Sequence, residues 1–152
     1  MTERVLNILR RQGKRIHCLF DGDVINNLSS SQIKLLMEQI AEIGSVRKNL
    51  AIFDYQLKPE KYDLYISSGI SPVIVPSDKD VYLALECLDV VNYQQTDVLC
   101  VGVSDESMLP ILVKAREKSE ILLICQTKEG AKNYMPYIDY LIIIKDISGK
   151  TT

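Results

Sequence analysis

Short apolar runs alternate with segments of helical periodicity along the chain, and this alternation restricts the fold more than any other feature. Runs such as Leu141-Ile-Ile-Ile144 are apolar at every position, which is typical of strands covered on both faces. Parallel strands need a crossover connection, usually a helix, so strand–helix–strand order predicts a mostly parallel sheet. We therefore expect a three-layer α/β/α fold with five to six strands.

The pattern also gives approximate boundaries for the elements. The expected strands occupy residues 15–20, 49–54, 72–76, 97–103, 120–125 and 139–144. The expected helices occupy residues 3–12, 29–43, 59–68, 80–92, 107–118 and 130–135. Ser29 and Gln32 match a capping box at the start of the second helix, and Pro59 suits the first turn of the third. We expect an N-terminal helix over 1–14, one domain over 15–146, and a flexible tail over 147–152.

Size and composition narrow the functional classes. A chain of 152 residues with 47% hydrophobic residues fits one globular domain. The net charge of −2 provides no general attraction to nucleic acid, so such a partner would need a local basic patch. No apolar run approaches the ~20 residues that span a bilayer, and the first residues do not resemble a signal peptide. These observations predict a cytoplasmic protein with no membrane association.

The four cysteines are expected to act as small buried hydrophobic residues. Cys18, Cys100 and Cys125 lie in apolar runs, and Cys87 lies in a helical segment. None forms a Cys-x-x-Cys pair, so a thiolate metal site or a redox pair is disfavoured. His17, the single histidine, lies inside the first expected strand and is interpreted as a packed side chain.

Three acidic residues follow expected strands, and they are the best candidates for a functional site. Asp21 ends the run Ile16-His-Cys-Leu-Phe20, Asp80 comes shortly after residues 72–76, and Asp105 follows residues 98–101. The carboxyl ends of parallel strands line a common crevice, so these carboxylates should meet there. They would repel one another unless a cation or shared protons compensated them. The arrangement predicts a site for a divalent metal ion.

Each acid also has an ordinary structural interpretation. Asp21 and Asp23 can cap a turn after a strand, Asp80 can cap the following helix, and Asp105 can cap the helix near Ser107. Capping is the more common role for each acid alone. Their recurrence at three strand ends is what favours a shared site.

Four segments together resemble a known family. They are Leu19-Phe-Asp-Gly-Asp23, Asp78-Lys-Asp-Val-Tyr-Leu-Ala-Leu-Glu86, Val103-Ser-Asp-Glu-Ser-Met-Leu-Pro110 and Tyr137-Ile-Asp-Tyr-Leu-Ile-Ile143. Their order and spacing resemble the NYN domain, and more closely the LabA-like proteins of the PIN-like nuclease superfamily, over roughly residues 15–146. The resemblance implies a PIN-like fold and metal-dependent cleavage of RNA, with Mg²⁺ or Mn²⁺ as cofactor.

The resemblance also implies roles for individual residues. The family's catalytic and metal-binding acids match Asp21, Asp80 and Asp105, and Asp23 is a further candidate ligand. A fourth family acid falls on Ser107, and a family asparagine falls on Val24, so the chain departs from the pattern at these two positions. Apart from the resemblance, we expect Lys79, Ser104, Ser107 and Arg15 to contact RNA.

Other functions remain open from the sequence. A degenerate NYN-like module that binds RNA or protein without cleavage would also fit the departures at Ser107 and Val24. The segment Leu19-Phe-Asp-Gly-Asp-Val24 further resembles the first motif of haloacid-dehalogenase-type phosphatases, which makes a phosphatase a weaker alternative. A homodimer is compatible with a small α/β domain, although no interface pattern is visible.

Basic and aromatic residues provide further candidate contacts to RNA. Arg10, Arg11, Lys14 and Arg15 cluster before the first strand, where they would attract phosphate or simply form a solvated helix end. Tyr55, Tyr62, Tyr65 and Tyr82 are candidate stacking surfaces, although tyrosine at helical spacing more often packs in the core.

Overall fold

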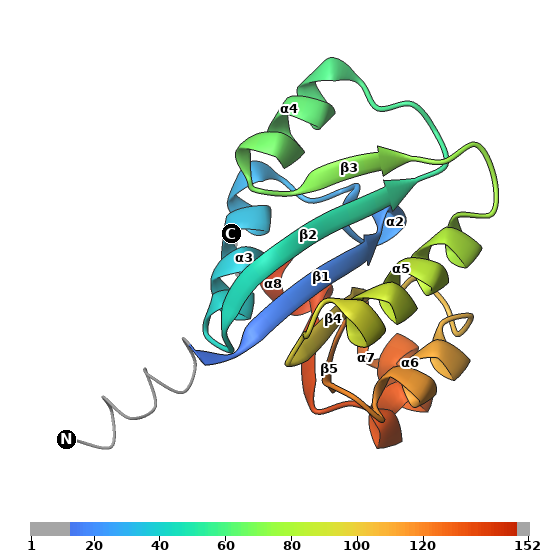
Figure 1. Ribbon diagram of the computed structural model, residues 1–152. Helices are drawn as coiled ribbons and strands as arrows, with labels where there is room; N and C mark the ends of the chain where they lie inside the picture. The colour runs from blue at the N-terminus through green and yellow to red at the C-terminus, as the bar shows by residue number, and fades with distance from the viewer. Residues whose placement is uncertain (1–12, 149–152) are drawn as a thin grey trace, which may run out of the picture.

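The computed structural model describes residues 13–148 and contains a six-stranded sheet in which every strand is parallel to its neighbours (Figure 1). The strand order is β3-β2-β1-β4-β5-β6. The strands are β1 (Arg15–Asp21), β2 (Ser45–Phe53), β3 (Ser71–Ile74), β4 (Val98–Gly102), β5 (Glu120–Cys125) and β6 (Tyr140–Ile143). The predicted parallel α/β architecture is confirmed.

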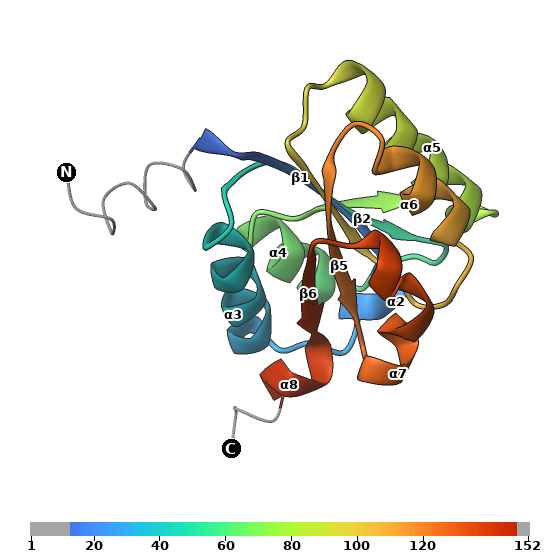
Figure 2. The ribbon, with the colours of Figure 1, turned by 90° about the horizontal axis from the view of Figure 1, so that it is seen from below.

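Helices cover both faces of the sheet (Figures 1 and 2). One layer contains α2 (Gly22–Ile25), α3 (Ser30–Ala41), α4 (Pro59–Ser67) and α8 (Ile144–Ser148). The other contains α5 (Lys79–Tyr93), α6 (Leu109–Ala115), α7 (Lys128–Ala131) and the 3₁₀ helix η1 (Lys132–Tyr137). Within residues 13–148, no helix has the length and apolar character needed to cross a bilayer.

Strand side chains alternate between two separate cores. Phe20 and Phe53 face the layer of α3 and α4, whereas Leu19 and Ile52 face α5 and α6. All four are fully buried, as the continuous apolar runs predicted. The sheet is therefore the middle of three layers.

Local signals in the sequence account for several helix boundaries. Ser29 and Gln32 form the predicted capping box: the Ser29 amide donates to Gln32 Oε1 at 2.8 Å, and the Gln32 amide donates to Ser29 Oγ at 3.3 Å. Pro59 is the first residue of α4. Gly69, with φ of +82°, follows the end of that helix in a conformation that glycine adopts without steric cost.

Several predicted boundaries were wrong. Strand β2 begins at Ser45 rather than residue 49, because Ser45 already pairs with Arg15 of β1 while exposed Arg47 interrupts the apolar pattern. The domain continues beyond residue 146, since Ile147 of α8 is 1% exposed and belongs to the core. Helix α6 is shorter than the expected segment 107–118. The helix predicted over 3–12 lies outside the described residues.

The strand order reverses direction between β1 and β4. From β1 the chain adds β2 and β3 on one side, then crosses through α5 to start β4 on the other side. The ends of β1 and β4 therefore lie at the point where the strand order reverses, and open α/β sheets usually bind ligands in the crevice at this point. Gly22 allows close approach here, because a Cβ at this position would lie 2.8 Å from the Ile52 carbonyl oxygen.

Candidate acidic site at the ends of β1 and β4

Asp21 is the buried centre of the crevice. It is the last residue of β1, is 3% exposed, and caps α2 by accepting a hydrogen bond from the Asp23 amide at 3.0 Å. Its other carboxylate oxygen accepts a 2.6 Å hydrogen bond from Ser104 Oγ, just after β4. The predicted capping role and the predicted position at the cleft are thus both present in one side chain.

Lys79 supplies positive charge to this carboxylate. Its Nζ lies 3.0 Å from Asp21 Oδ1 and also pairs with Asp23. The side chains of Lys79 and Asp21 are only 12% and 4% exposed. Burial alone would lower the pKa of Lys79, but the hydrogen bonds to Asp23 and Asp21 raise the pKa overall, so the ammonium stays charged.

The backbone before α5 places Lys79 in the cleft. Asp78 is the N-cap of α5 and has φ of +56°, a left-handed conformation that aspartate tolerates better than most residues. The N-cap position predicted for Asp80 is therefore occupied by Asp78, and the Asp78 side chain makes no capping hydrogen bond. Asp80 lies in the first turn of the helix instead.

Asp80 and Asp105 approach each other across Ser107. The pKa of Asp80 is raised by burial and by the negative charges of Asp105 and Asp21. The pKa of Asp105 is lowered, chiefly by hydrogen bonds from the Ser107 side chain and amide, the latter at 2.8 Å. Asp105 caps only this turn, because α6 begins later, at Leu109. The three predicted acids therefore influence one another electrostatically.

The charges and oxygen donors around Asp21 can be compared with the needs of the predicted divalent metal ion. Asp21, Asp23, Asp80 and Asp105 provide four carboxylates against one ammonium on Lys79, a surplus of negative charge that a cation would relieve. Within residues 13–148, however, no three His, Cys, Asp or Glu side chains are placed to hold one metal ion. A Mg²⁺ ion that keeps several waters would need only one or two of these carboxylates.

Arg15 does not reach this cleft, so it lies apart from the other residues that we expect to contact RNA. It begins β1 whereas Asp21 ends it, and six residue steps of a strand span about 20 Å. Its guanidinium instead pairs with Asp97 at 3.0 Å. Strand polarity alone predicts this separation.

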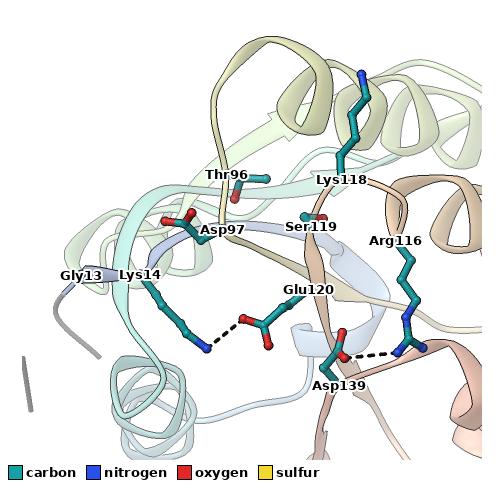
Figure 3. Close-up of a pocket in the computed structure, with 9 residues that line it drawn as sticks. All are labelled: Gly13, Lys14, Thr96, Asp97, Arg116, Lys118, Ser119, Glu120 and Asp139. Carbon is teal, nitrogen blue, oxygen red and sulfur yellow. Dashed lines mark hydrogen bonds and ion pairs between the residues drawn. The ribbon is translucent and has the colours of Figure 1, made fainter. Parts of the chain in front are cut away.

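A hollow of ≈ 730 Å³ lies at the opposite end of the sheet, where β1 begins (Figure 3). Its charged lining side chains are largely paired. Lys14 contacts Glu120 at 2.8 Å, and Arg116 contacts Asp139 at 3.3 Å. Asp139 also accepts a 2.8 Å hydrogen bond from the Ile121 amide, so it has a structural role here. Lys14 therefore has an ion-pair partner here; Arg10 and Arg11 lie outside the described residues.

The remaining predicted residues have mainly structural positions. Tyr65 is fully buried and stacks on Phe53 with ring centroids 5.4 Å apart, whereas Tyr55 is 40% exposed. His17 is buried in β1, and burial lowers its pKa. All four cysteines are buried and unpaired, as predicted.

One supporting residue has no signal in the sequence. Tyr134 in η1 donates a 2.6 Å hydrogen bond to the Asp105 carbonyl and so supports the loop after β4. The two residues are 29 positions apart, and no local pattern links them.

The fold places this chain in the class of α/β proteins with a six-stranded all-parallel sheet of order 321456 flanked by helices. No family model matches the chain. It is similar to the uncharacterized protein MJ0482 of Methanocaldococcus jannaschii, with 23% identity over 138 residues. The match covers 89% of this chain but only 58% of that relative.

A solved structure shares the fold. The protein of unknown function VPA0982 from Vibrio parahaemolyticus superposes with a TM-score of 0.72 over 88% of this chain and 94% of that chain. The sequence identity is 13%, so the likeness concerns the fold alone.

Proposed function

We propose that this protein is a metal-dependent ribonuclease of the NYN/PIN-like type. The observation that carries the proposal is the concentration of negative charge at the strand ends. Burial of Asp80, together with the charges of Asp105 and Asp21, raises the pKa of Asp80. An RNA phosphate would be repelled by this cleft unless a cation were bound. The same divalent ion that neutralises the cleft could therefore admit the substrate.

The proposed roles follow the chemistry of the side chains. One or two of the carboxylates of Asp21, Asp80 and Asp105 would bind Mg²⁺ or Mn²⁺, with Asp23 at the rim and water completing the coordination. When bound, such an ion would stabilise charge on phosphoryl oxygens and lower the pKa of a bound water. Ser104 holds Asp21 in place through its 2.6 Å hydrogen bond. Lys79, once released from Asp21, could contact the phosphate.

A second function is favoured by Lys79 and Ser107. Lys79 already compensates Asp21 and Asp23, and Ser107 lacks the carboxylate found in the resembling family. In this alternative, the chain keeps the NYN-like fold and binds RNA or protein without cleaving it. The phosphatase alternative, which requires a nucleophilic aspartate, remains a prediction.

Cleavage of a labelled RNA in Mn²⁺ tests the first proposal. We expect wild-type cleavage that is lost in the Asp21→Asn/Asp105→Asn double variant and retained in Asp89→Asn, which changes an exposed acid on α5. Wild-type cleavage that is absent, or that survives in the double variant, would refute the proposed hydrolysis by this site.

Ser107→Asp distinguishes the two functions. The added carboxylate would lie beside Asp80 and Asp105, where a further ligand should strengthen metal binding. If the wild type is inactive and this variant cleaves RNA, the degenerate interpretation is supported. If neither protein cleaves or binds Mn²⁺, the cleft is not a metal site.

A further inference from the structure

We propose that the hollow beside α2 binds one base of the RNA strand whose phosphate occupies the acidic cleft, an inference that rests on the proposed function. The hollow has a volume of ≈ 340 Å³ and lies between the end of α2 and the segment that joins β2 to α4. Asn26, Tyr55, Lys58, Lys61 and Tyr65 contribute to its lining.

The hollow adjoins the cleft through α2. Asp21 caps the start of this helix and Asn26 caps its end. Four helical residues rise about 6 Å along the axis, so the two places can contact neighbouring parts of one strand. Strands β1 and β2 end on the same edge of the sheet, next to α2 (Figure 1).

Tyr55 offers a fixed aromatic surface. Its ring packs edge-on against Phe53, with centroids 5.6 Å apart and planes at 73°, and its hydroxyl accepts a 3.3 Å hydrogen bond from Asn26 Nδ2. Although held at these two points, the residue remains 40% exposed. A tyrosine fixed in this way can stack on a base with little loss of side-chain entropy.

The polar groups of the hollow suit a nucleotide. Its lining contains Lys58 and Lys61 and no carboxylate, in contrast to the acidic cleft. Lys61 uses one N–H in a 2.9 Å bond to the Asn26 carbonyl, which leaves two donors for a phosphate. Asn26 holds the hydroxyl of Tyr55 through its Nδ2 at 3.3 Å, so both polar side chains keep fixed positions at the hollow.

Binding to a phosphorothioate-linked RNA pentamer, labelled for fluorescence anisotropy and measured in Mn²⁺, tests this subsite. The pentamer is compared with versions that lack the base at each position in turn. We expect removal of one particular base to weaken wild-type binding on the order of tenfold, since stacking on an aromatic side chain has effects of that size. Tyr55→Ala should lose as much affinity and become insensitive to that base. Tyr55→Phe should retain most of the affinity.

Tyr93→Ala is the matched control, because Tyr93 is 79% exposed at the far end of α5. Lys58→Ala should reduce the salt dependence of binding by about 0.7 in the log–log slope if it contacts one phosphate. The subsite is refuted if Tyr55→Ala binds like Tyr93→Ala, if it still responds to removal of the same base, or if the wild type does not bind the pentamer.

The same proteins separate this inference from the proposed function. Cleavage of unmodified RNA with base-independent binding would refute only the subsite. Base-dependent binding through Tyr55 without any cleavage would refute only the hydrolysis.

Discussion

Replacing Lys79 by methionine tests whether an internal ammonium holds the acidic cleft together. The variant keeps an unbranched apolar stem but removes the charge 3.0 Å from Asp21. At that distance, the Coulomb attraction is about 5.5 kcal/mol for an effective dielectric constant near 20. Desolvation offsets part of this attraction in the wild type, whereas in the variant Asp21 stays buried without its partner. Breaking a buried pair from one side usually costs about 3–5 kcal/mol.

We expect Lys79→Met to lower the free energy of unfolding by about 3 kcal/mol, the lower end of that range, because Ser104 and the Asp23 amide still donate to Asp21. For a chain of this length, the melting temperature should fall by roughly 6–12 °C. Urea and thermal unfolding followed by circular dichroism would measure both quantities. Lys114→Met is the control.

Lys114 forms an exposed pair with Glu117 at 3.4 Å, with side chains 69% and 62% exposed. Its loss should change stability by no more than about 0.5 kcal/mol. If Lys79→Met is no more destabilising than Lys114→Met, the ion pairs do not stabilise the cleft and the reasoning is wrong.

The stability of the wild type and of Lys79→Met can also be compared with and without a divalent ion. If Mg²⁺ or Mn²⁺ competes with Lys79 for Asp21, the variant should gain more stability from the metal than the wild type does. A ligand at 100 times its dissociation constant stabilises the folded state by about 2.7 kcal/mol. Equal metal effects on the two proteins would show that Lys79 does not occupy the cation position.

Two further predictions concern pH. The pKa of Asp80 is raised in the folded protein, so ionisation of this carboxyl group destabilises the fold as pH rises above about 4. Asp80→Asn should therefore be more stable than the wild type at pH 7, and the difference should shrink towards pH 3. Asp89→Asn is the control, and a destabilised Asp80→Asn would contradict the repulsion between Asp80 and Asp105. The pKa of Asp97 is lowered chiefly by its hydrogen bond from Arg15, so this carboxylate stabilises the fold above about pH 4 and the contribution is lost as pH falls further. Asp97→Asn should therefore be less stable at pH 7 and converge with wild type below about pH 3 in urea titrations; a constant difference would argue against this linkage.

The sheet could be predicted because its signals are local and repeated. Apolar runs mark the buried strands, and Ser29, Pro59 and Gly69 mark helix ends through side-chain or backbone chemistry of their own. Strand β2 was shortened in the prediction because exposed Arg47 lies within it. The final helix was missed because Ile147 gains its burial from α3, which is distant in sequence.

The candidate site was predictable only in part. Parallel topology brings the strand ends together, so the sequence pattern alone assigns Asp21 and Asp105 to one edge of the sheet. The partner of Asp21 could not be assigned, because the contact with Lys79 depends on the left-handed backbone of Asp78. Arg15 shows the opposite case: the direction of β1 already separates it from Asp21.

The charge pattern along this edge of the sheet implies an order of events. The cleft around Asp21 carries surplus negative charge, whereas the hollow at Tyr55 is lined by two lysines and no carboxylate. An RNA strand would therefore be attracted first to the hollow, where long-range repulsion is weakest. Its phosphate could approach Asp21 only after a cation had neutralised the cleft and released Lys79. Under the proposed function, base binding at Tyr55 should thus persist without metal at reduced affinity, whereas cleavage should require it.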